Sequence, residues 1–135
     1  MNQEDEKKRI LFIEDNPSLR ELCAYYFEKA GFQIDAAAMG VDGIKAALES
    51  APDLIVLDIA LPDMSGMDVL TRLRLSEGTR NIPVVIITAF ESEENRGRAA
   101  RDGVKKFMIK PVSLMGLLEV VRSALEGQMD TELAP

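Results

Sequence analysis

Short apolar runs alternate with longer amphipathic segments along most of the chain. Four of the runs are nearly continuous in Ile, Leu, Val, Phe or Met, whereas a fifth, weaker run alternates apolar with polar positions. Near-continuous runs of this length are typical of strands that are buried on both faces of a parallel sheet. We therefore predict five strands, over residues 10–13, 32–36, 54–57, 84–87 and 107–109.

The amphipathic segments between these runs predict helices over residues 17–30, 41–49 and 67–75, a fourth that ends near 101 and a last that ends near 125. Ser92 and Ser113 precede the last two helices and are candidate N-caps. Because strand and helix alternate five times, the pattern predicts an α/β fold with helices on both faces of a parallel sheet. The side chains expected to face the sheet from the first two helices are Leu19, Leu22, Cys23, Tyr26 and Phe27, and Ile44, Ala47 and Leu48.

Length and composition narrow the class of protein. The 135 residues suit one domain, which we place at 8–127, between a charged N-terminal arm (1–7) and a C-terminal tail or linker stub (128–135). A single cysteine excludes an internal disulfide, and the absence of histidine excludes His-based zinc sites and triads. The net charge of −7 argues against direct binding to nucleic acid or to an anionic membrane. No apolar run reaches the ~18 residues of a membrane span and no signal peptide is recognisable, so we expect a soluble cytoplasmic protein.

Polar residues follow four of the predicted strands. Glu14 and Asp15 come after the first strand, Asp58 after the third, Thr88 at the end of the fourth and Lys110 after the fifth. The carboxyl ends of parallel strands share one edge of a sheet, so these side chains are expected to converge. Two carboxylates ~4 Å apart repel by roughly 4 kcal/mol at an effective dielectric of about 20, and such a cluster recruits a hard cation such as Mg²⁺. A lysine and a threonine beside it suit phosphoryl transfer to an aspartate.

The blocks LFIEDN, LDIALPDMSG, VVIITA and KFMIKP carry these residues. In order, spacing and strand context they resemble the receiver domain of two-component response regulators, the CheY-like superfamily, over residues 8–127. The resemblance implies a doubly wound, flavodoxin-like (βα)5 fold with five helices and strand order 2-1-3-4-5. It also implies a role in phosphorelay signal transduction, with no enzymatic activity beyond the domain's own phosphorylation and dephosphorylation.

The resemblance assigns a role to each carboxylate. Asp58 would accept a phosphoryl group from the phosphohistidine of a histidine kinase or from a phosphotransfer protein. Asp15 would bind Mg²⁺, or Mn²⁺ as an alternative, directly, and Glu14 would do so mainly through water. Asp58 itself and the backbone carbonyl of Ala60 would complete the metal ligands from the protein.

The same resemblance implies a switch. Lys110 would bind one phosphoryl oxygen, and the hydroxyl of Thr88 would donate a hydrogen bond to another. The peptide bond between Lys110 and the following proline would be cis. As Thr88 moves toward the phosphoryl group, the aromatic ring of Phe107 would turn inward and alter the surface formed by the fourth helix, fifth strand and fifth helix. A downstream protein or output domain would bind that surface, and a phosphorylation-dependent homodimer through the last two helices is left open.

The acidic pair is Glu14 and Asp15 where the family commonly has two aspartates, so the affinity for the metal is expected to differ. Two other features bear on how the switch would work. Ala60 and Phe90 occupy the positions that tune hydrolysis of the phosphoryl group, and neither side chain can orient an attacking water. We therefore expect a phosphoaspartate that decays slowly. Lys105 and Lys106 stand where many transcription-factor receivers have an acidic pair, which reverses the local charge on the output surface.

Other functions remain to be weighed. A phosphatase of the haloacid-dehalogenase type needs a second aspartate where Ala60 stands, and a nucleotide-binding module needs a glycine loop where Asn16 and Pro17 stand. The sequence therefore argues against both of these functions. A receiver-like adaptor that works without phosphorylation stays open, as does the N-terminal receiver fragment of a longer regulator. The sequence names neither the kinase nor the target.

Overall fold

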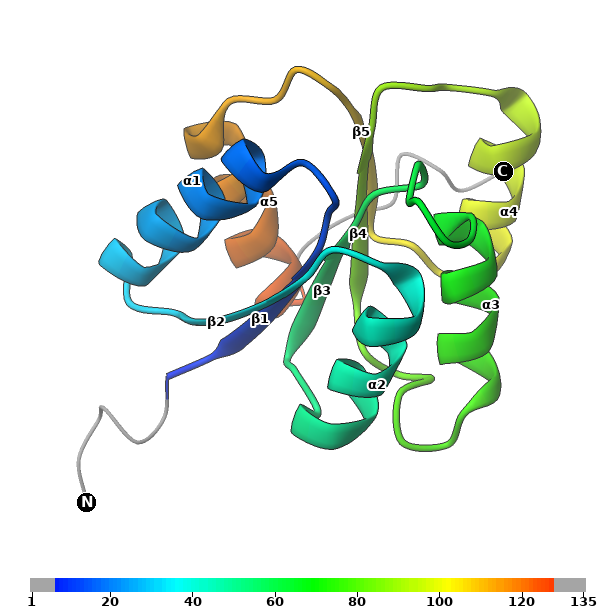
Figure 1. The fold of residues 1–135 in the computed structure, drawn as a ribbon, viewed down its shortest axis with the longest axis horizontal. Coiled ribbons are helices and arrows are strands. Elements are labelled where there is room, and N and C mark those ends of the chain that lie inside the picture. The colour runs from blue at the N-terminus through cyan, green and yellow to red at the C-terminus, as the bar shows by residue number, and fades with distance from the viewer. Residues whose placement is uncertain (1–6, 128–135) are drawn as a thin grey trace.

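The computed structural model describes residues 7–127, which form one parallel sheet with helices packed on both of its faces (Figure 1). The strand order β2-β1-β3-β4-β5 confirms the predicted order and the predicted fold class. The strands are β1 (Arg9–Ile13), β2 (Gln33–Ala37), β3 (Leu54–Leu57), β4 (Val84–Thr88) and β5 (Lys106–Ile109). The helices are α1 (Pro17–Lys29), α2 (Gly40–Ser50), α3 (Gly66–Leu75), α4 (Glu93–Arg101) and α5 (Leu114–Leu125).

The sheet separates two apolar layers. Helices α1 and α5 cover one face, and α2, α3 and α4 cover the other (Figure 1). Along β1, Ile10 and Phe12 point into the first layer and Leu11 points into the second, as the alternation of a strand requires. The ring of Phe12 meets the ring of Phe27 edge to face, with centroids 5.2 Å apart. Strands β3 and β4 are buried along their whole length, which explains why their sequences are continuously apolar.

Side chains cap four of the five helices. The predicted caps Ser92 and Ser113 are confirmed, because each hydroxyl accepts a hydrogen bond from a backbone N–H in the first turn of its helix. Asn16 and Ser65 play the same part for α1 and α3. Each such bond satisfies a backbone donor that the helix itself leaves unpaired.

Helix α2 begins differently. Its N-cap residue, Met39, has no side-chain acceptor to offer. Instead the carboxylate of Asp63, in the loop between β3 and α3, accepts hydrogen bonds from the backbone N–H groups of Val41 (2.9 Å) and Gly40 (2.7 Å). These bonds hold the pKa of the Asp63 carboxyl below its ordinary value. They also tie the loop that follows β3 to a neighbouring helix.

Two predicted core residues are wrong, and every predicted strand except 54–57 differs from the observed strand by one residue at one or both ends. The side chains of Leu22 and Leu48 are 55% and 53% exposed. Each lies next in sequence to a buried residue, Cys23 or Ala47, and one residue corresponds to about 100° around a helix. Strand β2 begins one residue later than predicted and pairs only with β1, so it is an edge strand and is less buried than the others.

The predicted N-terminal arm, apart from residue 7, and the predicted tail at 128–135 lie outside the described residues. Within residues 7–127, no helix combines the length and the apolar character that crossing a membrane requires.

Candidate functional site

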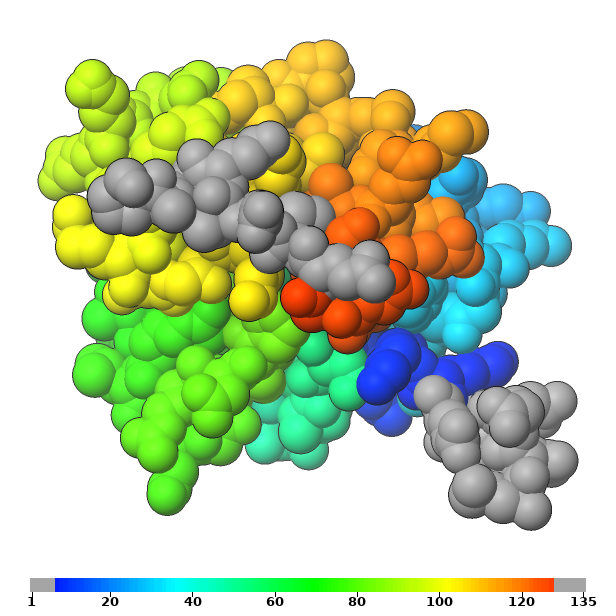
Figure 2. Space-filling view, turned by 180° about the vertical axis from the view of Figure 1, so that it is seen from behind, coloured from blue at the N-terminus to red at the C-terminus, as the bar shows by residue number. Residues whose placement is uncertain are grey.

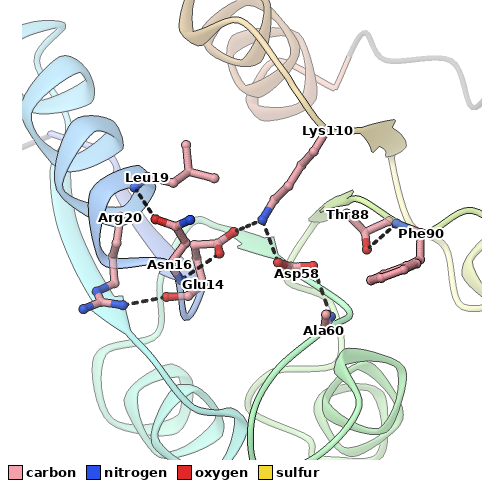
Figure 3. Close-up of polar contacts among 9 residues, drawn as sticks. All are labelled: Glu14, Asn16, Leu19, Arg20, Asp58, Ala60, Thr88, Phe90 and Lys110. Atoms are coloured by element: carbon pink, nitrogen blue, oxygen red, sulfur yellow. Dashed lines mark hydrogen bonds and ion pairs between the residues drawn. The ribbon is translucent and has the colours of Figure 1, made fainter.

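Five predicted site residues meet at the carboxyl edge of the sheet. Glu14 and Asp15 follow β1, Asp58 follows β3, Thr88 ends β4 and Lys110 follows β5. One carboxylate oxygen from each of the three acidic residues lies within 4.8 Å of the others. The strand order makes this possible, because β1, β3, β4 and β5 are successive neighbours in the sheet. Figure 3 shows the Glu14, Asp58 and Lys110 side chains pointing toward one another across this edge.

Lys110 bridges two of the carboxylates. Its Nζ lies 2.8 Å from Oε1 of Glu14 and 2.8 Å from Oδ2 of Asp58. The two acidic side chains are 2% and 4% exposed, and that of Lys110 is 21% exposed. A single lysine therefore neutralises part of a cluster of three acidic groups, and the cluster keeps an excess of negative charge.

The pKa values of the bridged groups follow from this geometry. Burial raises the pKa of the Glu14 carboxyl, against the opposing effect of its contact with the ammonium of Lys110. Burial works to lower the pKa of Lys110, but the contacts with Asp58 and Glu14 outweigh it and raise the pKa above the ordinary value. Lys110 is therefore a cation across the physiological range, available to bind an oxyanion.

Backbone contacts fix the loop after β1. Oε2 of Glu14 accepts a hydrogen bond from the N–H of Asn16 (3.0 Å), and Nη1 of Arg20 donates to the backbone carbonyl of Glu14 (2.9 Å). The N–H of Glu14 donates to the carbonyl of Ala37 at the end of β2 (2.9 Å). Sequence reasoning did not assign Asn16 and Arg20 to the site, because contacts made through backbone N–H and carbonyl groups have no signature in residue types.

The segment around Asp58 is held as tightly. Its Oδ1 accepts a hydrogen bond from the N–H of Ala60 (3.1 Å), and its own N–H donates to the carbonyl of Ile13 (3.0 Å). Gly66, at the start of α3, lies directly against this backbone. A Cβ on Gly66 would overlap the carbonyl oxygen of Asp58 and would lie 2.7 Å from Cα of Ile59. The glycine of the DMSG block is therefore required by close backbone packing, which the sequence motif did not explain.

Thr88 and Phe90 lie on the opposite side of Asp58 from Glu14 (Figure 3). The side chain of Thr88 is fully buried, and its hydroxyl accepts a hydrogen bond from the N–H of Phe90 (3.3 Å). The ring of Phe90 is 66% exposed. The Thr88 hydroxyl keeps its own proton for another acceptor, since in this bond it acts as the acceptor.

Phe107 contacts α4 in a way that the sequence did not predict. Its ring is 4% exposed, and the guanidinium carbon of Arg96 lies 4.8 Å from the ring centroid. Arg96 also forms an ion pair at 2.8 Å with Glu91, in the loop that follows β4. The peptide bond between Lys110 and Pro111 is cis, as expected.

The carboxylate cluster fits a hard divalent cation. All of its side-chain donors are oxygens, and Oε1 of Glu14 is buried without a hydrogen bond of good geometry among the described residues, although the ammonium of Lys110 is its ion-pair partner. Oxygen donors, close spacing and excess negative charge are the properties that Mg²⁺ prefers. Glu14, Asp15 and Asp58 are the side chains that would hold it.

Known proteins share this fold and these blocks. Residues 10–122 match the response regulator receiver domain family. The chain is 39% identical over 117 residues to the transcriptional regulatory protein HprR of Escherichia coli, and the aligned region covers 87% of this chain and 51% of HprR. It is 32% identical over 118 residues to the polar-differentiation response regulator DivK of Brucella ovis, and the aligned region covers 87% of this chain and 96% of DivK. The chain thus spans about half the length of HprR and nearly all of DivK.

Among solved structures, a CheY-like receiver domain protein from Methanospirillum hungatei superposes with a TM-score of 0.85 at 26% identity, over 90% of this chain and 96% of that one. The match to the family spans most of the chain, and the fold and strand order agree with it. The chain therefore belongs to the receiver domains of two-component response regulators, whose general role is phosphorylation-dependent signalling.

Proposed function

We propose that Asp58 is the phosphoacceptor of this receiver domain. A carboxylate oxygen of Asp58 attacks the phosphorus of a phosphohistidine on a histidine kinase or phosphotransfer protein. The N–P bond breaks, its electrons return to the imidazole, and an acyl phosphate forms on Asp58. The observation that carries the proposal is the position of Asp58, a buried carboxylate at the open edge of the sheet that is bound by Lys110.

The neighbouring groups have complementary roles. Lys110, which contacts Asp58 in this structure, would bind a phosphoryl oxygen, and the hydroxyl of Thr88 would donate to another. Glu14, Asp15, Asp58 and the backbone carbonyl of Ala60 would hold Mg²⁺, with Mn²⁺ as an alternative. The bound metal supplies neutralisation of the charge on the phosphoryl oxygens. The residues of the chain then position the acceptor and exclude water from it, and the domain catalyses no reaction other than its own phosphorylation and dephosphorylation.

A hollow of about 410 Å³ beside Lys110 supports access for a phosphodonor. It is lined by residues at the start of α1, directly after β4 and in the loop after β5, including Leu19, Ala89 and Val112. A donor seated there would approach the edge of the sheet from the side of Lys110. We leave the identity of the kinase open.

Phosphorylation would act on the output surface through Thr88 and Phe107. When Thr88 moves to the phosphoryl group, the inward position of the Phe107 ring gains stability, and the α4–β5–α5 surface adjusts around it. A downstream protein, an output domain or a second copy of the chain would bind there. Many receivers of transcription factors have an acidic pair where this chain has two lysines, at 105–106. A partner that binds such an acidic pair is therefore not expected to bind this chain in the same way. Location in the cytoplasm stays a prediction from the sequence.

We propose that the phosphoaspartate decays slowly. Ala60 and Phe90 flank Asp58 and Thr88, and neither side chain carries a group that could orient water. Replacement of Phe90 by Glu should accelerate the decay, measured as loss of phosphate from the phosphorylated protein over time. An unchanged or slower decay in Phe90→Glu would contradict the proposal.

The phosphoacceptor is tested by intact mass spectrometry after incubation with acetyl phosphate and Mg²⁺. Wild type and Asp68→Asn, which removes an exposed carboxylate on α3, should each gain one phosphate, and Asp58→Asn should gain none. Phosphate on Asp58→Asn would place the acceptor elsewhere. Failure of the folded wild type to take up phosphate from acetyl phosphate and from any kinase would favour the adaptor that works without phosphorylation.

A further inference from the structure

A second cluster of charge lies at the opposite end of the sheet from Asp58. The amino ends of β4 and β5 meet the last turns of α3 and α4 there, around a hollow of about 450 Å³. Figure 2 shows the segment that precedes β4 (bright green) and the segment that precedes β5 (yellow) on the same face. The charged side chains that line the hollow are Arg74, Arg80, Arg101, Asp102 and Lys105.

Arg74 lines the hollow and is hydrogen-bonded to the backbone on two of its sides. Its Nε donates to the carbonyl of Asp102 (2.8 Å), and its Nη1 donates to the carbonyls of Ile82 (2.8 Å) and Arg80 (3.2 Å). One guanidinium therefore connects the loop before β4 to the turn before β5. This loop and this turn form the two walls of the hollow. Because one side chain is hydrogen-bonded to both walls, the shape of the hollow is set before any ligand binds.

The charge of the hollow is opposite to that of the molecule. Four cationic side chains and one carboxylate line it, whereas the whole chain carries a net charge of −7. Within residues 7–127, no ion pair engages the side chains of Arg80, Arg101 or Lys105. Arg80 and Arg101 are exposed, and Lys105 is half-buried. These three cations come from the two walls and are available to an anion.

The geometry selects among anionic ligands. Sites for small molecules are mostly apolar and enclosed, and this hollow is polar and open. A nucleic acid would carry its charges well beyond the hollow, over a surface that is acidic overall, and repulsion acts there within a Debye length of about 8 Å. A short anionic segment stays within the hollow, where four cations outnumber the single carboxylate of Asp102. Arginine side chains also match carboxylates in shape, since their donors form two parallel hydrogen bonds.

We propose that this hollow binds a short acidic segment of a partner protein, with carboxylates paired to Arg80, Arg101 and Lys105. The site is separate from the phosphoacceptor and its existence does not depend on the proposed chemistry of Asp58. Charge steering of this kind accelerates association and weakens as salt is added.

The test is a titration of the unphosphorylated ¹⁵N-labelled chain with a hexaglutamate peptide, followed by amide chemical shifts and repeated at about 150 mM salt. The amides of residues 80–82 and 101–105 should shift, and the affinity should fall with salt. The double variant Arg80→Gln/Arg101→Gln should bind about five- to tenfold more weakly, because two exposed ion pairs are lost. The control Lys29→Gln/Lys45→Gln makes the same change in net charge at exposed sites on other helices and should bind as wild type does.

Three results would overturn the proposal. The first is the absence of shifts at the hollow, and the second is equal weakening by the control variant, which would reduce the effect to net charge. The third is tighter binding at the same amides by pyrophosphate or by a single-stranded oligonucleotide, which would make it a phosphate site. Binding by the wild type and by the two double variants is measured in the same spectra that report whether each protein is folded. The titration needs no phosphorylation, so its outcome is independent of the mass measurement on Asp58.

Discussion

Replacement of Lys110 by Met removes the cation at the centre of the site and keeps a side chain of similar length. In the wild type, Nζ of Lys110 lies 2.8 Å from an oxygen of Glu14 and 2.8 Å from an oxygen of Asp58. Both carboxylates are almost completely buried. The variant leaves two buried negative groups facing each other, with Asp15 close by.

The size of the effect follows from these distances. At 2.8 Å and an effective dielectric of about 20, each attraction is roughly 6 kcal/mol before desolvation is subtracted. Removal of one partner from a buried ion pair costs about 3–5 kcal/mol in measured cases. Water reaches the side chain of Lys110, which is 21% exposed. We therefore expect the free energy of unfolding to fall by about 2–4 kcal/mol.

The assay is urea unfolding at pH 7 in the presence of a chelator, followed by circular dichroism. The double variant Lys110→Met/Glu14→Gln should regain much of the loss, because only one of the two bridged carboxylates remains charged. Lys45→Met, at an exposed position on α2, should change the free energy of unfolding by less than about 0.5 kcal/mol. A loss below about 1 kcal/mol for Lys110→Met, or no recovery in the double variant, would refute the view that Lys110 stabilises the two carboxylates.

Three further predictions concern other parts of the domain. Arg96→Gln removes the contact with the Phe107 ring and an ion pair, so urea unfolding should show a loss of about 1 kcal/mol, and an unchanged midpoint would contradict it. Gly66→Ala drives a methyl group into the backbone of Asp58; we expect a loss of about 1–3 kcal/mol and slower phosphorylation by acetyl phosphate, and wild-type rates would show that the loop can move aside. Burial raises the pKa of the Cys23 thiol to about 11, so at pH 8 iodoacetamide should alkylate the folded protein far more slowly than the urea-unfolded protein, and equal rates would contradict this.

The arrangement of the strands and the members of the site follow from the sequence. Apolar runs of four or five residues identify the buried strands because central strands of a parallel sheet contact helices on both faces. Glu14, Asp58, Thr88 and Lys110 could be grouped before the structure was known, because each follows or ends such a run and the carboxyl ends of parallel strands share one edge. The functional roles of these residues remain proposals.

Tertiary contacts decided what residue types could not. The exposure of Leu22 depends on how α1 is rotated against the sheet, and a rotation of one residue separates it from buried Cys23. The link from Lys110 to Asp58 spans 52 positions in sequence, and the cap that Asp63 provides to α2 spans 23. The cationic hollow around Arg74 likewise joins two loops through backbone carbonyls, which every residue possesses. Periodicity is a local property, so it identifies elements and their ends, whereas distances between side chains are set by the packing of the whole sheet and its helices.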